Sequence, residues 1–217
     1  ALAIAGFLTL GSSWQAKATG NASEAGVDVI ITDGGGNDDS TVGTTADGTC
    51  VEVANDTEFY IDVFVKGIPS DDGVSGYEYD LEFTDGLLGV VAFDEIYLLH
   101  RTNGSCTSYY LDKDGTPDWT SPWWIFDSDL ADATTCSEPE DGDGVLTRVT
   151  MKTHASNTGL ATIELSDTYR YIYTLDETGG IGANEWISGR VAVGQDCPAE
   201  SDPAITGQTI GTWNGSC

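Results

Sequence analysis

Three aspartates near the middle of the chain have a spacing that could bind a hard metal cation. They are Asp112, Asp114 and Asp118, and Gly115 lies between the second and the third. Carboxylate oxygens at alternating positions around a glycine turn are ligands that Ca²⁺ takes in proteins. The segment differs from an EF-hand loop, because Gly115 is fourth in it and Trp123 stands at the twelfth position. Two interpretations therefore stand, a Ca²⁺ site and a solvated acidic loop, and no other cofactor is predicted.

The common catalytic motifs are missing from the sequence. The two histidines, His100 and His154, each adjoin a predicted turn and belong to no HExxH-type metal motif. No GxSxG nucleophile elbow occurs. A glycosidase pair of carboxylates would meet only in the folded chain, and nothing singles out two of the 36 acidic residues. We therefore predict a protein that is not an enzyme.

Three tryptophans, Trp119, Trp123 and Trp124, follow the aspartates closely. Aromatic rings near polar groups can stack on sugar rings, and the same side chains also pack in cores and anchor interfaces. No basic residue is interleaved with them, which disfavours a platform for nucleic-acid bases. The three tryptophans could therefore bind carbohydrate or pack in a core or interface, and we favour packing.

The strongly acidic charge of the chain disfavours two classes of partner, nucleic acids and anionic membranes. The chain has 8 Lys and Arg against 36 Asp and Glu, a formal charge of -28 and a pI near 4.1. Phosphate backbones and anionic membranes attract basic surfaces, so both are poor partners. Such an acidic surface suits a secreted soluble protein or one that takes up divalent cations.

The five cysteines favour disulfides, because no CxxC motif is present. Cys106 and Cys136 flank one long insertion, so a bond between them would staple it. Cys50 precedes the predicted core strands and Cys197 follows them, so a second bond would close the domain at its ends. Cys217 then pairs beyond this chain segment or with another chain.

Four Asn-x-Ser/Thr sequons could carry N-linked glycans, although such short motifs also arise by chance. Their asparagines are Asn21, Asn55, Asn103 and Asn214.

The elements that must position these groups are β-strands. Apolar residues alternate with polar ones in several short runs, separated by segments rich in Gly, Pro, Asp and Ser. The predicted strands cover residues 27–32, 59–66, 74–83, 87–93, 145–151, 160–165, 169–175 and 186–193. No helical period competes with this pattern, which predicts an all-β domain of two facing sheets.

Two of these blocks resemble a cohesin domain. The run FVKGIPSDDGVSGYEYDLEFTDGLLGVV (Phe64–Val91) resembles the family's opening strands, and GVLTRVTMKTHASNTGLATIELSD (Gly144–Asp167) resembles its later pair of strands. The resemblance implies an antiparallel β-sandwich of jelly-roll type. It also implies a receptor module that binds a dockerin, a small helical Ca²⁺ domain, on a sheet face. The matching motifs are structural and include no catalytic residue.

The N-terminal residues 1–18 resemble the apolar and small-residue parts of a secretory signal, and the apolar run is too short to span a membrane. Large apolar side chains that could face one way along a strand, with one on the opposite face, are Leu2, Ile4, Leu8, Leu10 and Phe7. Such a strand could complete the sheet of a neighbouring copy. An assembly strand and a signal remnant both remain open.

The ends share a repeat, TVGTTADGTC at residues 41–50 and TIGTWNGSC at residues 209–217. We therefore predict an arm and linker over 1–26, a cohesin-like sandwich over 27–197, and over 198–217 a linker and the start of a second, similar domain.

Three functions follow from these patterns. The first is an extracellular structural or adhesion module, a self-assembling subunit of a cell-surface filament or layer. The second is a cohesin receptor for a dockerin, and the third is a carbohydrate-binding module.

Overall fold

A computed structural model describes residues 21–30, 36–38, 40–70, 76–94, 117–128, 141–173 and 180–199, a few of them by backbone alone. Within these ranges the chain contains strands and no helix. The strands are β1 (Ala22–Asp28), β2 (Thr49–Val53), β3 (Glu58–Ile68), β4 (Gly76–Phe83), β5 (Leu88–Asp94), β6 (Trp123–Ser128), β7 (Gly142–Thr153), β8 (Gly159–Tyr173), β9 (Gly180–Ile181), β10 (Ala183–Ile187) and β11 (Gly189–Val193).

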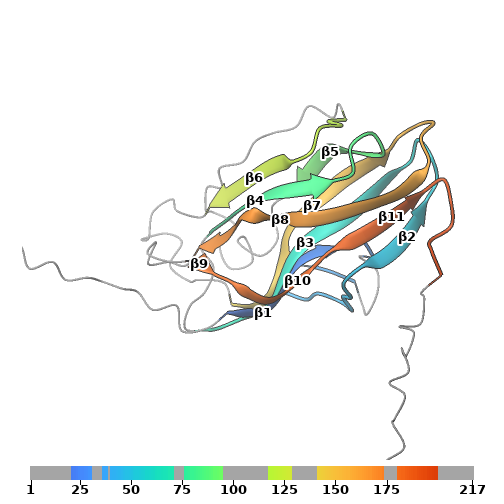
Figure 1. Cartoon of the computed structure of the whole chain (residues 1–217). Coiled ribbons are helices and arrows are strands. Elements are labelled where there is room, and N and C mark those ends of the chain that lie inside the picture. The colour runs from blue at the N-terminus through green and yellow to red at the C-terminus, as the bar shows by residue number, and fades with distance from the viewer. Residues whose placement is uncertain are drawn as a thin grey trace, which may run out of the picture.

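The strands form two sheets that pack face to face as a sandwich (Figure 1). Sheet A has the order β10-β1-β3-β7-β5, and sheet B has the order β2-β11-β8-β4-β6 with β9 beside β8. Most neighbours are antiparallel, but β1 with β10 and β11 with β2 are parallel. The predicted all-β sandwich is confirmed, with sheets that are mixed at these two pairings.

Alternation along each strand fills the space between the sheets. In β4, Tyr77, Tyr79, Leu81 and Phe83 are buried, while the residues between them are half-exposed. The hydroxyl of Tyr77 donates to the Leu146 carbonyl at 2.9 Å and accepts from Thr147 Oγ1 at 2.8 Å, so its polar end is satisfied inside the core.

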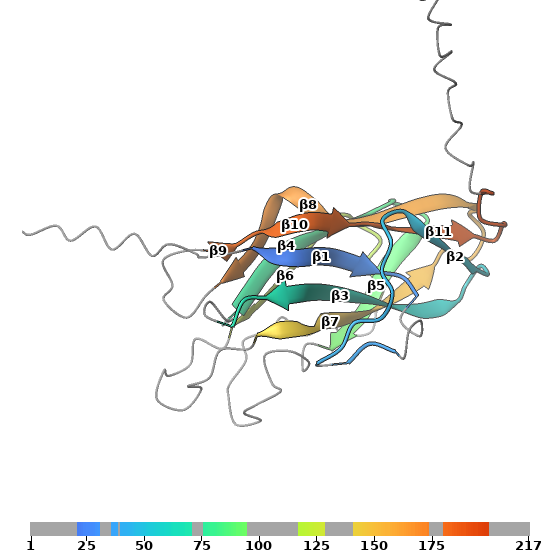
Figure 2. The same ribbon diagram turned by 90° about the horizontal axis from the view of Figure 1, so that it is seen from below.

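Residues 36–38 and 40–48, which we call the covering segment, cross part of the outer face of sheet A over β1 and β3 (Figure 2). In β3 the residues Val63 and Val65 belong to the core between the sheets, so Phe64 between them points outward. Phe64 is nevertheless fully buried, and Lys66 Nζ lies 5.6 Å from the centroid of its ring. The covering segment therefore shields an apolar side chain on the outside of the sheet.

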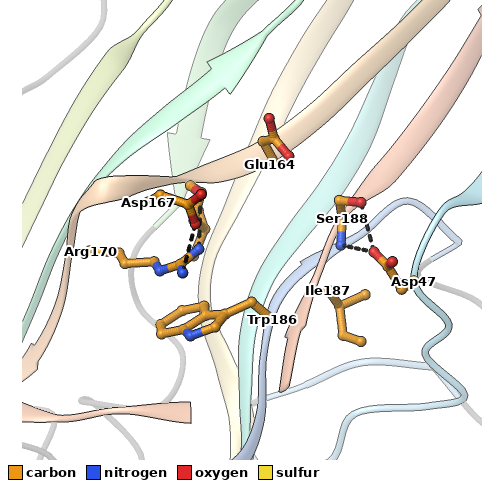
Figure 3. Close-up of a pocket in the computed structure, with 8 residues that line it drawn as sticks. Asp47, Glu164, Asp167, Arg170, Trp186, Ile187 and Ser188 are labelled. Atoms are coloured by element: carbon orange, nitrogen blue, oxygen red, sulfur yellow. Dashed lines mark hydrogen bonds and ion pairs between the residues drawn. The ribbon is translucent and has the colours of Figure 1, made fainter. Parts of the chain in front are cut away.

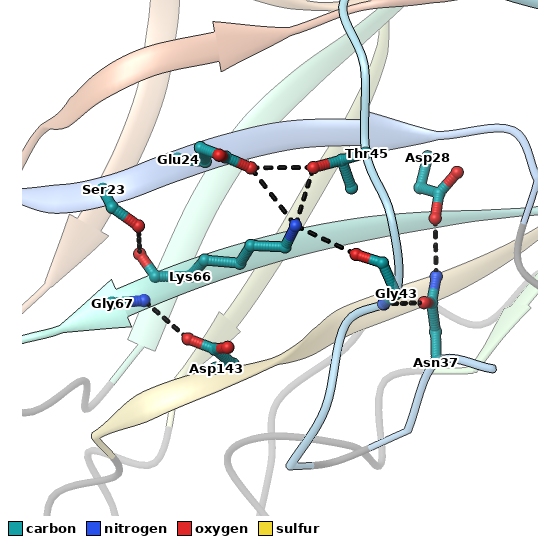
Figure 4. Close-up of polar contacts among 9 residues, drawn as sticks. All are labelled: Ser23, Glu24, Asp28, Asn37, Gly43, Thr45, Lys66, Gly67 and Asp143. Carbon is teal, nitrogen blue, oxygen red and sulfur yellow. Dashed lines mark hydrogen bonds and ion pairs between the residues drawn. The ribbon is translucent and has the colours of Figure 1, made fainter. Parts of the chain in front are cut away.

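Polar contacts fix the covering segment to sheet A (Figure 4). Lys66 Nζ donates to the Gly43 carbonyl at 3.0 Å and to Thr45 Oγ1 at 2.7 Å, and it forms an ion pair with Glu24 at 3.2 Å. The hydrogen bond from Thr45 Oγ1 to Glu24, together with Lys66, lowers the pKa of that carboxyl although partial burial opposes it. One lysine thus joins two strands to the segment above them.

A buried charged cluster fixes the other end of the segment. Arg148 on β7 pairs with Asp62 on β3 through two hydrogen bonds, Nε to Oδ1 at 2.7 Å and Nη2 to Oδ2 at 2.8 Å. The amide of Asn37 donates to Asp28 at 2.9 Å and to Asp62 at 3.1 Å. Burial raises the pKa of the Asp62 carboxyl, against the opposing effect of Arg148 and Asn37. Each buried carboxylate therefore has a partner from within the chain.

The disulfide between Cys50 and Cys197 is confirmed, with Cα atoms 6.0 Å apart and a sequence separation of 147. Cys50 lies in β2, and Cys197 follows β11, the strand that pairs with β2. Closing a loop of this length stabilises the fold by about 5 kcal/mol in the chain-entropy model.

The strand boundaries differ from the sequence prediction in several places. The single strand predicted at 186–193 is divided at Ser188 into the end of β10 in sheet A and β11 in sheet B, and β2, β6 and β9 lie where no strand was predicted. β1 begins at Ala22, inside the segment assigned to the linker, and pairs there with both β10 and β3. The two strands predicted at 160–165 and 169–175 are one strand, β8, with an irregularity between Leu165 and Arg170. A polar stretch within the run looked like a turn in the sequence, yet it is a bulge that keeps the strand continuous.

Candidate functional site

The outer face of sheet B carries acidic and aromatic side chains with no segment like 36–48 fixed across it in the described chain (Figure 1). These side chains come from β4, β6 and β8, and we call them the acidic–aromatic face. Its members are Glu78, Asp80, Glu82, Trp124, Glu164, Tyr169 and Tyr171. Trp124 is 38% exposed and Tyr171 is 45% exposed, which is unusual for large aromatic residues.

Glu78 holds the aromatic side chains of this face in place. Its Oε1 accepts a hydrogen bond from Trp124 Nε1 at 3.1 Å and another from the hydroxyl of Tyr169. Tyr169 in turn contacts Tyr171 edge to face, with ring centroids 5.5 Å apart. The hydrogen bond to Glu78 raises the pKa of the Tyr169 phenol, so it stays protonated at neutral pH. The three rings are therefore ordered before any partner arrives, which lowers the entropy cost of binding.

The remaining carboxylates of the face are crowded together. Glu82 lies directly opposite Glu164 in the register of β4 and β8. Like charges at this position destabilise a sheet. In the part of the chain that the structure describes, Asp80, Glu82 and Glu164 have no hydrogen-bond or ion-pair partner. Partial burial, and the charges of Glu82 and Glu78, raise the pKa of Asp80. A cationic group brought to this face would relieve the repulsion.

The arrangement suits binding. Ordered aromatic rings provide apolar contact area with a polar edge, and the surrounding carboxylates accept hydrogen bonds from basic side chains. No group of three or more metal-binding side chains occurs among the residues that the structure describes.

The three tryptophans considered as a carbohydrate platform lie in three different surroundings. Trp119 lies near β5 and contacts His154 edge to face, with ring centroids 5.4 Å apart. Trp123 is buried in the core, where its ring contacts Phe93 at 5.2 Å. Trp124 points to the outer face of sheet B. Consecutive residues of β6 face opposite ways, so the three rings do not form one carbohydrate platform.

The predicted Ca²⁺ ligands are mostly outside the described residues. Asp112 and Asp114 lie there, and so do Cys106, Cys136, Cys217 and the assembly residues Leu2, Ile4, Phe7, Leu8 and Leu10. Asp118 is described, and its backbone pairs with that of Val90 while its carboxylate accepts from Thr120 N at 3.1 Å.

Two sequon asparagines are described, and they differ. Asn21 is exposed, and its amide donates to Asn184 at 3.3 Å. The Asn55 amide nitrogen donates to the carbonyls of His154 at 2.9 Å and Asn157 at 2.7 Å. A glycan on Asn55 would replace one of the two N–H donors and so remove one of these hydrogen bonds. Asn103 and Asn214 lie outside the described part of the chain.

The sequence prediction did not single out Glu78, Tyr169 or Tyr171. A signal was present, since Glu78, Asp80 and Glu82 alternate with buried residues and therefore share the solvent face of one strand. The contact of Tyr169 with Glu78 joins residues 91 positions apart, which a local pattern does not encode.

No family model matches this sequence, and no curated protein matches it either. Solved structures do match. The seventh ScaB type I cohesin of Pseudobacteroides cellulosolvens has 17% identity and a TM-score of 0.51, over 70% of this chain and 92% of that one. CaCohA2 of Clostridium acetobutylicum has 11% identity and a TM-score of 0.50, over 70% of this chain and 95% of that one. The third ScaC cohesin of Acetivibrio cellulolyticus, solved in complex with a ScaB dockerin, has 18% identity and a TM-score of 0.49, over 66% and 97%.

Among the described residues there is no helix that is long and apolar enough to cross a membrane. The two sheets and their structural neighbours agree with the resemblance found in the sequence, and the chain has the fold of a cohesin-like domain.

Proposed function

We propose that this chain is a non-enzymatic extracellular binding module that holds a partner protein on its acidic–aromatic face. One observation carries the proposal: aromatic rings surround Glu78 on a face whose other carboxylates, Asp80, Glu82 and Glu164, have no cationic partner among the described residues. The partner must present lysine or arginine side chains together with apolar ones, because that chemistry complements the face.

The resemblance of the sequence to cohesins makes a dockerin the first partner to test. The test is calorimetry with a panel of purified dockerin domains, and the matched variants are Trp124→Ala and Tyr60→Ala. Tyr60 is 55% exposed on the outer face of sheet A, so its removal controls for the loss of any exposed ring. Affinity should fall about 30-fold or more for Trp124→Ala, stay unchanged for Tyr60→Ala, and weaken with added salt.

Two results would contradict the proposal. One is binding that both variants retain equally. The other is a panel in which no dockerin binds while a glycan array gives a ligand that Trp124→Ala loses, which would favour the carbohydrate-binding alternative.

The self-assembling filament remains a prediction, because residues 1–18 lie outside the described chain. Electron microscopy of native material and sedimentation of a variant that lacks residues 1–18 test it. Assembly that persists without these residues would contradict a donated N-terminal strand. The Ca²⁺ site, the glycans and the Cys106–Cys136 disulfide also remain predictions.

A further inference from the structure

A cavity of about 220 Å³ lies beside the acidic–aromatic face, where β8 passes the crossover from β10 to β11. Glu164 belongs to both the cavity and the face. Figure 3 shows Arg170 and Trp186 on one side, Ser188 and Asp47 on the other, and Glu164 above the space between them. Leu165, Ile187 and Asp167 complete the lining.

The irregularity in β8 places charged side chains at this cavity. Tyr79 pairs with Arg170 and Leu81 pairs with Leu165, so residue 80 on β4 stands against residues 166–169 on β8. Bulges redirect side chains and occur often next to functional sites. Asp167 lies within the bulge and Arg170 directly after it, where the Arg170 guanidinium pairs with Asp167 and lies over the ring of Trp186.

Both side walls of the cavity are fixed by contacts within the chain. The Arg170 guanidinium stacks 4.0 Å above the ring of Trp186, pairs with Asp167 at 2.8 Å and donates to the Leu165 carbonyl at 3.3 Å. On the opposite wall, Asp47 Oδ1 accepts from the backbone nitrogen of Ser188 at 2.9 Å and from its hydroxyl at 2.7 Å. Contacts within the chain therefore hold both walls in place.

The charge of the lining favours a cation. Three carboxylates line the cavity against one guanidinium, and Asp167 already pairs with that guanidinium. Hydrogen bonds from Ser188 lower the pKa of Asp47, so this carboxylate is ionised at neutral pH. Glu164 has no partner in the described chain and faces Glu82 across the strands. Leu165, Ile187 and Trp186 contribute apolar atoms beneath these groups.

We propose that the cavity receives the ammonium group of a lysine side chain from the partner protein. The ammonium would lie between Glu164 and Asp47, and its aliphatic stem would lie against Leu165 and Ile187. Arginine fits less well, because Arg170 already occupies the face of Trp186 on which a second guanidinium would stack. That the lysine belongs to a partner protein rests on the proposed function.

The test uses the full chain, labelled with ¹⁵N and titrated with Nα-acetyl-lysine amide to about 50 mM, a range suited to a millimolar Kd. The amide of Ser188 and the indole of Trp186 should shift in a saturable manner. The norleucine analogue, which has no charge, and glucose should shift neither. Glu164→Gln should weaken lysine binding about fivefold. Glu185→Gln, which neutralises an exposed carboxylate of β10 outside the cavity, should not change it.

Equal shifts with lysine and norleucine amides, or equal affinity in Glu164→Gln and Glu185→Gln, would overturn the lysine site. The two proposals fail separately. A partner that is lost with Trp124→Ala but binds Glu164→Gln and Glu185→Gln equally removes the lysine site and keeps the binding face. If lysine amide binds saturably but Trp124→Ala does not weaken partner binding, the lysine site stands and the binding face is contradicted.

Discussion

On the outer face of sheet A, Glu24 lies beside Lys66 and Asp62 beside Arg148, whereas on the outer face of sheet B Glu82 lies opposite Glu164. Both faces belong to one very acidic chain. Three carboxylates of the first face, those of Glu24, Asp28 and Asp62, have cationic or amide partners from neighbouring strands and from the covering segment. Those of the second face, apart from Glu78, have none among the described residues. Contacts within the chain therefore neutralise these carboxylates of sheet A, and the contrast supports the proposal that the outer face of sheet B binds another molecule.

The largest effect should come from breaking the closed face at Asp62. Asp62→Ala leaves the partly buried Arg148 without its carboxylate and removes one acceptor of the Asn37 amide. We expect a loss of about 3 kcal/mol in the free energy of unfolding, measured by urea denaturation. Asp80→Ala on the open face is the control and should cost less than about 0.5 kcal/mol. Equal losses would contradict the distinction between the faces.

The next effect concerns binding and not stability. Trp124→Ala should reduce the free energy of partner binding by about 2 kcal/mol or more, because an ordered aromatic anchor is lost. The urea midpoint should remain nearly unchanged, since the ring is 38% exposed and lies outside the core. A variant that loses stability to the same extent as affinity would place Trp124 among the structural residues.

A smaller effect of the opposite sign is expected at Asp80. Its pKa is raised by burial and by Glu82 and Glu78, so its ionised form destabilises the folded state. Asp80→Asn should therefore stabilise the protein by a few tenths of a kcal/mol at pH 7 while it weakens partner binding. The gain should disappear below pH 3.8, the ordinary pKa of the group, because the carboxyl is then protonated in both states. Thermal unfolding as a function of pH checks both parts.

The smallest effect is expected from Asp38 in the covering segment. Hydrogen bonds from Ser40 and Thr41 lower its pKa below the ordinary value of 3.8. Its contribution to stability is therefore present above that pH and is lost as the pH falls through the folded pKa. Near neutral pH the wild type should have a higher Tm than Asp38→Asn, whereas it should have a lower Tm than Asp80→Asn, and both differences should shrink in acid. Differences of the same sign at the two positions would contradict the contrast between the two faces.

The sequence was a good guide where a local pattern controls the structure. Alternation placed Tyr77, Tyr79, Leu81 and Phe83 in the core, and the positions of Cys50 and Cys197 around the strands predicted their disulfide. The same alternation sends Trp123 inward and Trp124 outward, which separates residues that looked like one cluster in the sequence.

The rest depends on contacts between distant segments. Phe64 is buried because a segment some twenty residues earlier covers it, and Tyr169 reaches Glu78 only across a strand pairing. The continuity of β8 was missed for a related reason. Ser166 and Asp167 have turn-like chemistry, but pairing with β4 on both sides of the bulge keeps the segment in the sheet.

The disulfide also determines how the domain would respond to a mechanical pull on its two ends. Tension that enters after residue 197 passes through the sulfur bridge to Cys50 and does not load the chain that lies between them. Only β1 and the covering segment, which precede Cys50, could be drawn out under force. The acidic–aromatic face lies wholly within the shielded loop, so a partner could stay attached while the N-terminal part of the domain extends.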